Sequence, residues 1–97
     1  MLETRKLTNH KYSQCHVEIG DNGTINFISY TTLVIRAVPF GGYGYILYCT
    51  NAYSQTTRRQ IGWFLKEYFG DISYYDMNRI SGSGEGIYAE RKHAKFW

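Results

Sequence analysis

The stretch from Tyr53 to Phe69 constrains the fold most, because the local signals for an α-helix agree there. Thr57 and Gln60 have the spacing of a capping box, in which two side chains three residues apart satisfy backbone N–H groups at a helix start. Gly70 follows the last apolar residue, where many helices end. At about 100° per residue, one stripe of the helix is mostly apolar and predicts its packing face. That stripe comprises Thr57, Ile61, Phe64, Leu65 and Tyr68.

The opposite flank of this helix is the predicted partner-binding surface. A Trp one turn after an Arg suits a cation–π pair, and both residue types are enriched at interface hot spots. Cations in a first helical turn oppose the macrodipole by roughly 0.3–1 kcal/mol each, and Gly62 in mid-helix costs about 1 kcal/mol relative to Ala. These costs favour a partner on this flank; in the alternative interpretation, another segment of the chain covers Trp63. The flank comprises Arg58, Arg59, Trp63, Lys66 and Glu67.

The segments before the helix predict β-strands. Gln14–Ile19 alternates apolar and polar residues, and Asp21–Thr24 contains Asn-Gly, a strong hairpin signal. Ile25–Val38 has apolar residues on both faces and predicts one long strand, with a bulge or bend at its polar centre, Ser29–Thr32. Tyr45–Thr50 alternates again and leads into the helix. The predicted fold class is therefore α+β, a three- to four-stranded antiparallel meander sheet with one main helix packed across it.

The long predicted strand needs cover on both of its faces. If it is regular, Leu33 shares a face with Phe27 and Ile35, and the helix covers that face. The second face then requires the carboxy-terminal segment, a second copy of the chain or a ligand.

The domain prediction places residues 1–80 in a single α+β domain. Residues 1–13 have room for a short edge strand, and Asp71–Ile80 can form a short second helix. Residues 81–97 begin as a Gly/Ser tether and continue as a basic and aromatic carboxy-terminal segment, which is either an extra strand or a mobile tail.

The composition indicates a binding protein and offers little for catalysis. The formal charge of +3 is too small to imply nucleic acid, whereas ten tyrosines are typical of contact surfaces or of cross-strand pairs. The histidines and carboxylates show no catalytic or metal-ligand spacing, so a non-enzymatic protein without cofactor or metal is expected. Cys15 and Cys49 are expected to be buried thiols of a reduced compartment. With no signal-peptide core and no apolar stretch long enough for a bilayer, the expected location is the cytoplasm, with no membrane partner.

Residues 42–48, Gly-Tyr-Gly-Tyr-Ile-Leu-Tyr, resemble the RNP1 signature of RNA-recognition motifs. In that family alternate aromatic residues of this strand stack on unpaired bases. The whole RNA-recognition fold is not expected, because the stretch upstream predicts a strand where that fold has a helix. The same residues can still stack bases in another fold. This alternative predicts single-stranded nucleic-acid binding by Tyr43, Tyr45, Tyr48, Arg58 and Arg59.

Two separated motifs resemble a family of small phage and prophage proteins. The first is Ser29–Val34, which matches an S-Y-x-T-x-V strand, and the second is Tyr53–Leu65, which matches a Y-S-x-T-T-x-R/K-H/Q-I-x-x-F-L helix start. The resemblance implies a stoichiometric inhibitor of a host or defence protein, of the anti-CRISPR or anti-defence kind, acting in the host cytoplasm. A homodimeric phage accessory protein is a further alternative. The predicted partner-binding residues are Tyr43, Tyr45, Tyr53, Arg58, Arg59, Trp63 and Lys66.

Overall fold

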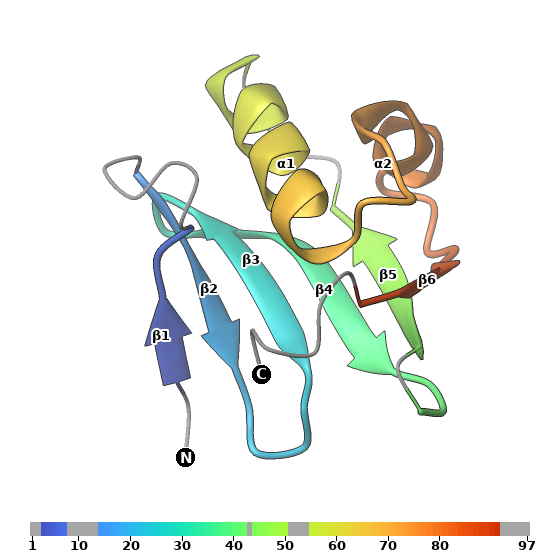
Figure 1. Cartoon of the computed structure of the whole chain (residues 1–97). Coiled ribbons are helices and arrows are strands. Elements are labelled where there is room, and N and C mark those ends of the chain that lie inside the picture. Colours follow the sequence, from blue (N-terminus) through green and yellow to red (C-terminus); the bar gives the residue numbers. More distant parts are fainter. Residues whose placement is uncertain (1–2, 8–13, 43, 51–54, 92–97) are drawn as a thin grey trace.

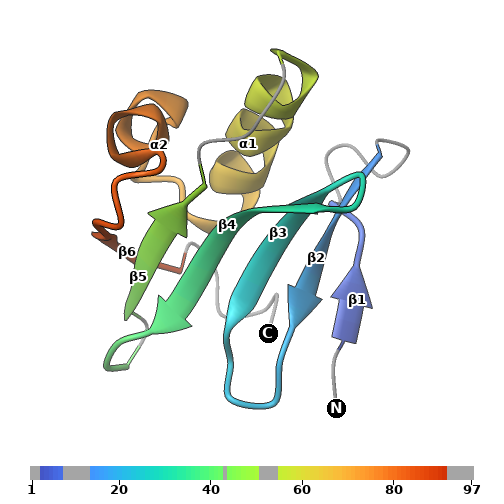
Figure 2. The ribbon, with the colours of Figure 1, turned by 180° about the vertical axis from the view of Figure 1, so that it is seen from behind.

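The computed structural model describes residues 3–7, 14–42, 44–50 and 55–91, which form one sheet and two helices (Figure 1). Six strands follow one another in chain order, and each pairs antiparallel with the next. Both helices lie on the same side of the sheet (Figures 1 and 2). The elements are β1 (Glu3–Arg5), β2 (Cys15–Ile19), β3 (Ile25–Ser29), β4 (Thr32–Pro39), β5 (Gly44–Cys49), α1 (Gln55–Tyr68), α2 (Tyr74–Ile80) and β6 (Ile87–Glu90).

The α+β class and the antiparallel meander were predicted correctly, but the number of strands was too low. The largest error concerns Ile25–Val38, which is a hairpin and not one strand. Ser29 pairs with Thr32 across a turn in which Tyr30 has a φ of 56°. A Tyr at positive φ is unusual, because Gly or Asn normally occupies such positions. The turn lies at Ser29–Thr32, where a bulge or bend was predicted, but the absence of Gly and Asn gave no sign that the chain reverses there.

The hairpin also changes which side chains share a face. The register of β3 against β4 shifts between Phe27 and Ile28, so that Phe27 pairs with Ile35 while Ile28 pairs with Leu33. Such a bulge inserts one residue and reverses the alternation beyond it. Leu33 therefore points away from the helices, contrary to the prediction that it shares a face with Phe27 and Ile35.

The core lies between the sheet and the helices. Phe64 of α1 stacks on Phe27 of β3, with 4.7 Å between ring centroids, and on Tyr68 at 5.2 Å. Phe69 contacts Phe64 at 5.9 Å and Tyr45 of β5 at 5.4 Å, both edge to face. The predicted packing stripe of α1 is buried along its whole length, which confirms that prediction: Thr57, Ile61, Phe64, Leu65 and Tyr68.

A buried polar contact joins α1 to β3. The Ser29 hydroxyl lies 3.0 Å from the Thr57 hydroxyl and also donates to Oε1 of Gln60. All three side chains are buried. The predicted capping box was wrong, because α1 already includes Gln55 and Thr57 lies in its first turn, with its hydroxyl directed to the sheet.

The carboxy-terminal part of the described chain extends the sheet. The predicted second helix is present as α2, and the Gly- and Ser-rich residues after it lead to β6. The Ser81 hydroxyl donates to the Thr50 carbonyl at 2.8 Å, and the Gly82 amide donates to the Cys49 carbonyl at 3.0 Å. Gly86 lies against β5, where an added Cβ would come within 2.3 Å of Ile46 Cγ2. Ile87–Glu90 thus forms an extra strand, and residues 92–97 lie outside the described part of the chain.

Candidate functional site

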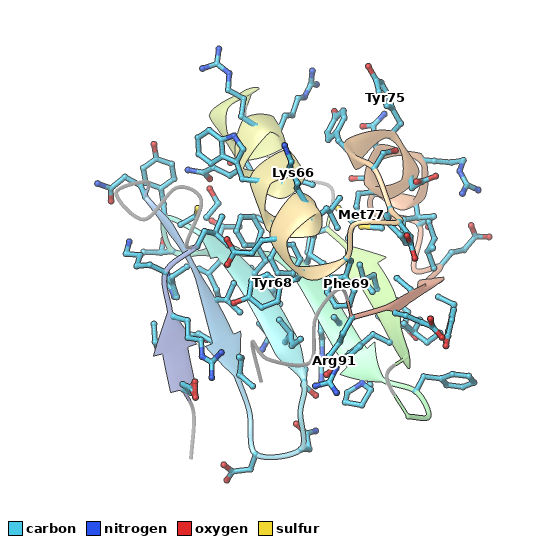
Figure 3. All side chains as sticks on the ribbon, viewed as in Figure 1. Lys66, Tyr68, Phe69, Tyr75, Met77 and Arg91 are labelled. Atoms are coloured by element: carbon cyan, nitrogen blue, oxygen red, sulfur yellow. The ribbon has the colours of Figure 1, made fainter. Side chains whose placement is uncertain are left out.

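The outer surface of α1 gathers the predicted cations in one place. We define the α1 platform as Arg58, Arg59, Gly62, Trp63 and Lys66. Arg58, Arg59 and Lys66 are exposed, and Gly62 and Trp63 are partly exposed. Spacings of three and four residues place the members above one another on successive turns. Lys66 extends from α1 away from the sheet (Figure 3).

The platform carries positive charge without a neighbouring carboxylate on the same helix. The first turn of α1 contains no acidic residue. Glu67 is the single acid in Gln55–Tyr68, and it is only 7 % exposed. The prediction that Glu67 joins Lys66 on the outer flank was therefore wrong, because Glu67 turns toward the body of the protein. The exposed side of α1 is consequently more basic than the sequence pattern indicated.

Gly62 and Trp63 differ in how the fold uses them. A Cβ added at Gly62 would have no heavy atom within 4 Å outside the local helix backbone. Packing in the described part of the chain therefore does not require a glycine here. Trp63 packs against the core while part of its ring remains accessible. Trp63 is therefore neither fully covered by another segment nor fully exposed, so neither of the two interpretations applies completely.

Of the three predicted contact tyrosines, Tyr45 is described, and it does not join the platform. Tyr45 is only 5 % exposed and packs on Phe69, and burial raises the pKa of its phenol against the opposing effect of Arg91. Tyr45 is thus a core residue and not a contact residue. Tyr43 and Tyr53 lie outside the described residues.

The predicted nucleic-acid set is divided between two sides of the sheet. Tyr48 alternates with Leu47 and Cys49, which are buried beneath the helices, so its own side chain points to the open face. Arg58 and Arg59 lie on α1, on the covered side. Tyr48 and the two arginines therefore do not form one surface, and buried Tyr45 has no face available for a base.

Sequence reasoning missed several exposed aromatic residues. Tyr88 of β6 and Phe40 of the β4–β5 turn are 50 % and 62 % exposed, and their rings meet edge to face at 6.1 Å. Tyr75 of α2 is 79 % exposed and projects outward from the helix layer (Figure 3). Strict alternation of buried and exposed positions in Ile87–Glu90 could have predicted that Tyr88 is exposed. No such signal exists in the sequence for Tyr75, because its direction depends on how α2 packs on the rest of the protein.

Two cavities in the described part of the chain lie beside β6 and its neighbours. One of about 340 Å³ is lined by Asp71, Ile72, Asp76 and residues 87–90. Asp76 already caps α2, because its carboxylate accepts hydrogen bonds from the Ser73 amide at 3.0 Å and the Ser73 hydroxyl at 3.2 Å. Within the described ranges, no three His, Cys, Asp or Glu side chains are grouped as metal ligands would be. Among those residues, neither helix is long and apolar enough to cross a membrane.

Comparison with known proteins gives a family and no activity. No curated protein and no solved structure shows significant similarity to the chain. The profile of one family matches residues 2–80, a range that contains β1 to α2 and ends before β6. The chain belongs to this family, which is described as a family of unknown function, DUF8033.

Proposed function

We propose that the protein is a small non-enzymatic binding protein whose α1 platform docks on an acidic surface of another protein. Three exposed cations line the outer side of one helix, and the only acid of that helix is buried. Opposite charges across an interface speed encounter and suppress wrong partners. The partly exposed Trp63 supplies the aromatic contact that interface hot spots favour.

The presence of a glycine at position 62 is the main observation that supports the proposal. A glycine in a helix interior costs about 1 kcal/mol relative to alanine, and a Cβ added at Gly62 would meet no heavy atom of the described residues within 4 Å outside the local helix backbone. Because packing among the described residues does not need this glycine, we attribute its cost to a partner whose atoms approach the helix backbone between Arg59 and Lys66. A side chain at this position would hold such a partner away.

The proposed biological role is stoichiometric inhibition of a host or defence protein. This part rests on the resemblance of Ser29–Val34 and Tyr53–Leu65 to small phage proteins, which commonly act by occupying a surface. Ser29–Val34 includes the β3–β4 turn, and the second motif leads into the platform helix. An inhibitor of this kind needs a docking surface and no catalytic group.

Nucleic acid is the competing partner for a basic helix. Binding through phosphate contacts releases counterions, so affinity falls steeply with salt. A protein partner held through Trp63 and the helix backbone depends less on salt, because most of its contacts are not ionic. Salt dependence and nuclease treatment therefore separate the two partners.

The test uses tagged full-length protein as bait in lysates of an infected or defence-expressing host, with and without nuclease. Three baits are compared with the wild type: Arg59→Glu, Lys66→Glu and Arg79→Glu. Arg79 is exposed on α2 and lies outside the platform, so its reversal is the matched control. The proposal predicts a nuclease-resistant partner that is lost with Arg59→Glu and Lys66→Glu and kept with Arg79→Glu. A partner that disappears with nuclease, or one equally weakened by all three reversals, contradicts it.

A further inference from the structure

The open face of the sheet carries a row of polar side chains that crosses five strands. Strand register aligns Thr4 with Glu18, Glu18 with Asn26, Asn26 with Arg36, and Arg36 with Tyr48. The alternate residues of these strands, including Val17, Phe27 and Leu47, are buried under the helices. We call this set the central row: Thr4, Glu18, Asn26, Arg36 and Tyr48.

The central row places complementary residues at matching strand positions on either side of Asn26. Glu18 lies one strand to one side of Asn26 and Arg36 one strand to the other. Neighbouring strands are about 4.8 Å apart, so the backbones at Glu18 and Arg36 are about 10 Å apart. Among the described residues, no ion pair joins these two side chains. Thr4 and Tyr48, which both carry hydroxyls, occupy the two outer positions. An acidic and a basic residue thus lie one strand to either side of the central Asn26.

Two groups of the row lack partners among the described residues. Asn26 Oδ1 is buried and has no hydrogen bond among the described residues. Arg36 is exposed, and in the same part of the chain its guanidinium forms no ion pair. A buried polar atom without a partner costs about 1–3 kcal/mol, and native proteins contain few of them. The Glu18 carboxylate has one contact, with His16 Nε2 at 3.3 Å on the same strand.

We propose that a second copy of the chain packs on this face about a twofold axis that runs along β3 past Asn26. This rotation places Glu18 opposite Arg36 of the second copy and Arg36 opposite its Glu18. The two Asn26 side chains then face each other across the axis. The same rotation places Thr4 opposite Tyr48, so every member of the central row faces a complementary group. A twofold interface requires this self-complementarity.

The neighbouring row adds apolar contact near the axis. His16, Ile28 and Leu33 are aligned on β2, β3 and β4. Ile28 is half-buried and lies on the same strand as Asn26, so the rotation packs it against its own copy. Leu33, which is 37 % exposed, then covers the His16 ring of the second copy. The β3–β4 bulge directs Leu33 to this face, so the bulge has a role in the interface.

The dimer is independent of the proposed partner binding. The helices lie on one side of the sheet (Figures 1 and 2), and strand alternation directs the central row to the other side, so the row and the α1 platform are separated by the sheet. A dimer formed through the sheet leaves both copies of the platform accessible. Loss of one activity therefore does not imply loss of the other.

Sedimentation velocity of the full chain, from about 1 to about 100 µM, tests the proposal by charge exchange. Arg36→Glu and Glu18→Arg each place like charges together and are expected to weaken dimerisation at least tenfold, whereas the Glu18→Arg/Arg36→Glu double variant restores it. Arg79→Glu makes the same change on α2 and leaves the dimer intact. Circular dichroism checks that each variant is folded. Arg36→Glu should perturb the fold least, because Arg36 is exposed.

Three results overturn the proposal. The first is a wild-type chain that remains monomeric at the highest concentration. The second is a dimer that survives Arg36→Glu, and the third is a dimer that the double exchange fails to restore, because an interface elsewhere on the molecule would behave in these ways. These measurements need no binding partner, so their outcome is separate from that of the lysate experiment.

Discussion

The contact between Ser29 and α1 makes Ser29→Ala the sharpest test of how the helix is held on the sheet. The Ser29 hydroxyl has one proton, which it donates to Gln60 Oε1, and it accepts from the Thr57 hydroxyl at 3.0 Å. The substitution removes both hydrogen bonds and leaves Gln60 Oε1 buried without this donor. A net hydrogen bond contributes about 1 kcal/mol, and a newly unpaired buried acceptor costs about 1–3 kcal/mol. The expected loss of unfolding free energy is therefore about 2–3 kcal/mol.

Urea denaturation followed by circular dichroism measures this loss. A chain of this size has a total unfolding free energy on the order of 5–15 kcal/mol, and the urea dependence is about 1–3 kcal/mol per molar. The midpoint should fall by roughly 1 M with the slope unchanged. Thr32→Ala is the matched control, because Thr32 pairs with Ser29 but is exposed and should shift stability by less than about 0.5 kcal/mol. If Ser29→Ala is as stable as Thr32→Ala, the buried contact does not hold α1 in place.

Three further predictions concern stability and reactivity. Gly62→Ala should raise the unfolding free energy by up to about 1 kcal/mol, since a Cβ fits there. The same variant should weaken capture of the proposed partner. A loss of stability would contradict the absence of described atoms near an added Cβ. Burial, followed by the neighbouring Glu67 carboxylate, raises the pKa of Tyr68 from about 10 to about 12, so the folded chain keeps a proton that the unfolded chain releases in this range. Unfolding free energy should therefore fall by about 2–3 kcal/mol more between pH 9.5 and 12.5 in the wild type than in Tyr68→Phe, and parallel pH profiles would refute this. Cys15 and Cys49 are both buried, and burial raises the pKa of the Cys49 thiol, so neither should react with a thiol reagent until the chain unfolds; fast labelling of the native protein would contradict their burial.

The sequence predicted features that depend on periodicity within one element. The packing stripe of α1 was correct, because a 3.6-residue repeat of apolar side chains identifies a buried helix face regardless of the partner. The burial of Cys15 and Val17 followed likewise from alternation in β2. Such patterns are local, and tertiary structure preserves them.

The errors arose where two elements determine a position together. The β3–β4 turn has no Gly or Asn, and its Tyr30 at positive φ is tolerated because ladders on both sides hold it. Glu67 was assigned to the outer flank from its angle on the helix alone, yet it is buried in the folded protein. Tyr45 resembled a base-stacking residue by motif, but its strand presents it to Phe69.

Part of the geometry of the candidate site could also be predicted from the sequence. The exposure of Arg58, Arg59 and Lys66 was predicted correctly, since exposure opposite an apolar stripe follows from helix geometry. The symmetry of the central row escaped prediction, because it depends on the register of five strands and a one-residue shift moves every side chain to the other face.

Capture of a protein partner by the wild type and the Arg59→Glu variant, in nuclease-treated lysate, tests the central claim most directly. Arg59 is exposed and lies one turn from Gly62, so its reversal should leave the fold intact while reversing charge at the centre of the α1 platform. The account predicts a stoichiometric protein partner with the wild type and with Arg79→Glu, and its loss with Arg59→Glu. Equal recovery by all three baits would show that the partner binds elsewhere on the protein.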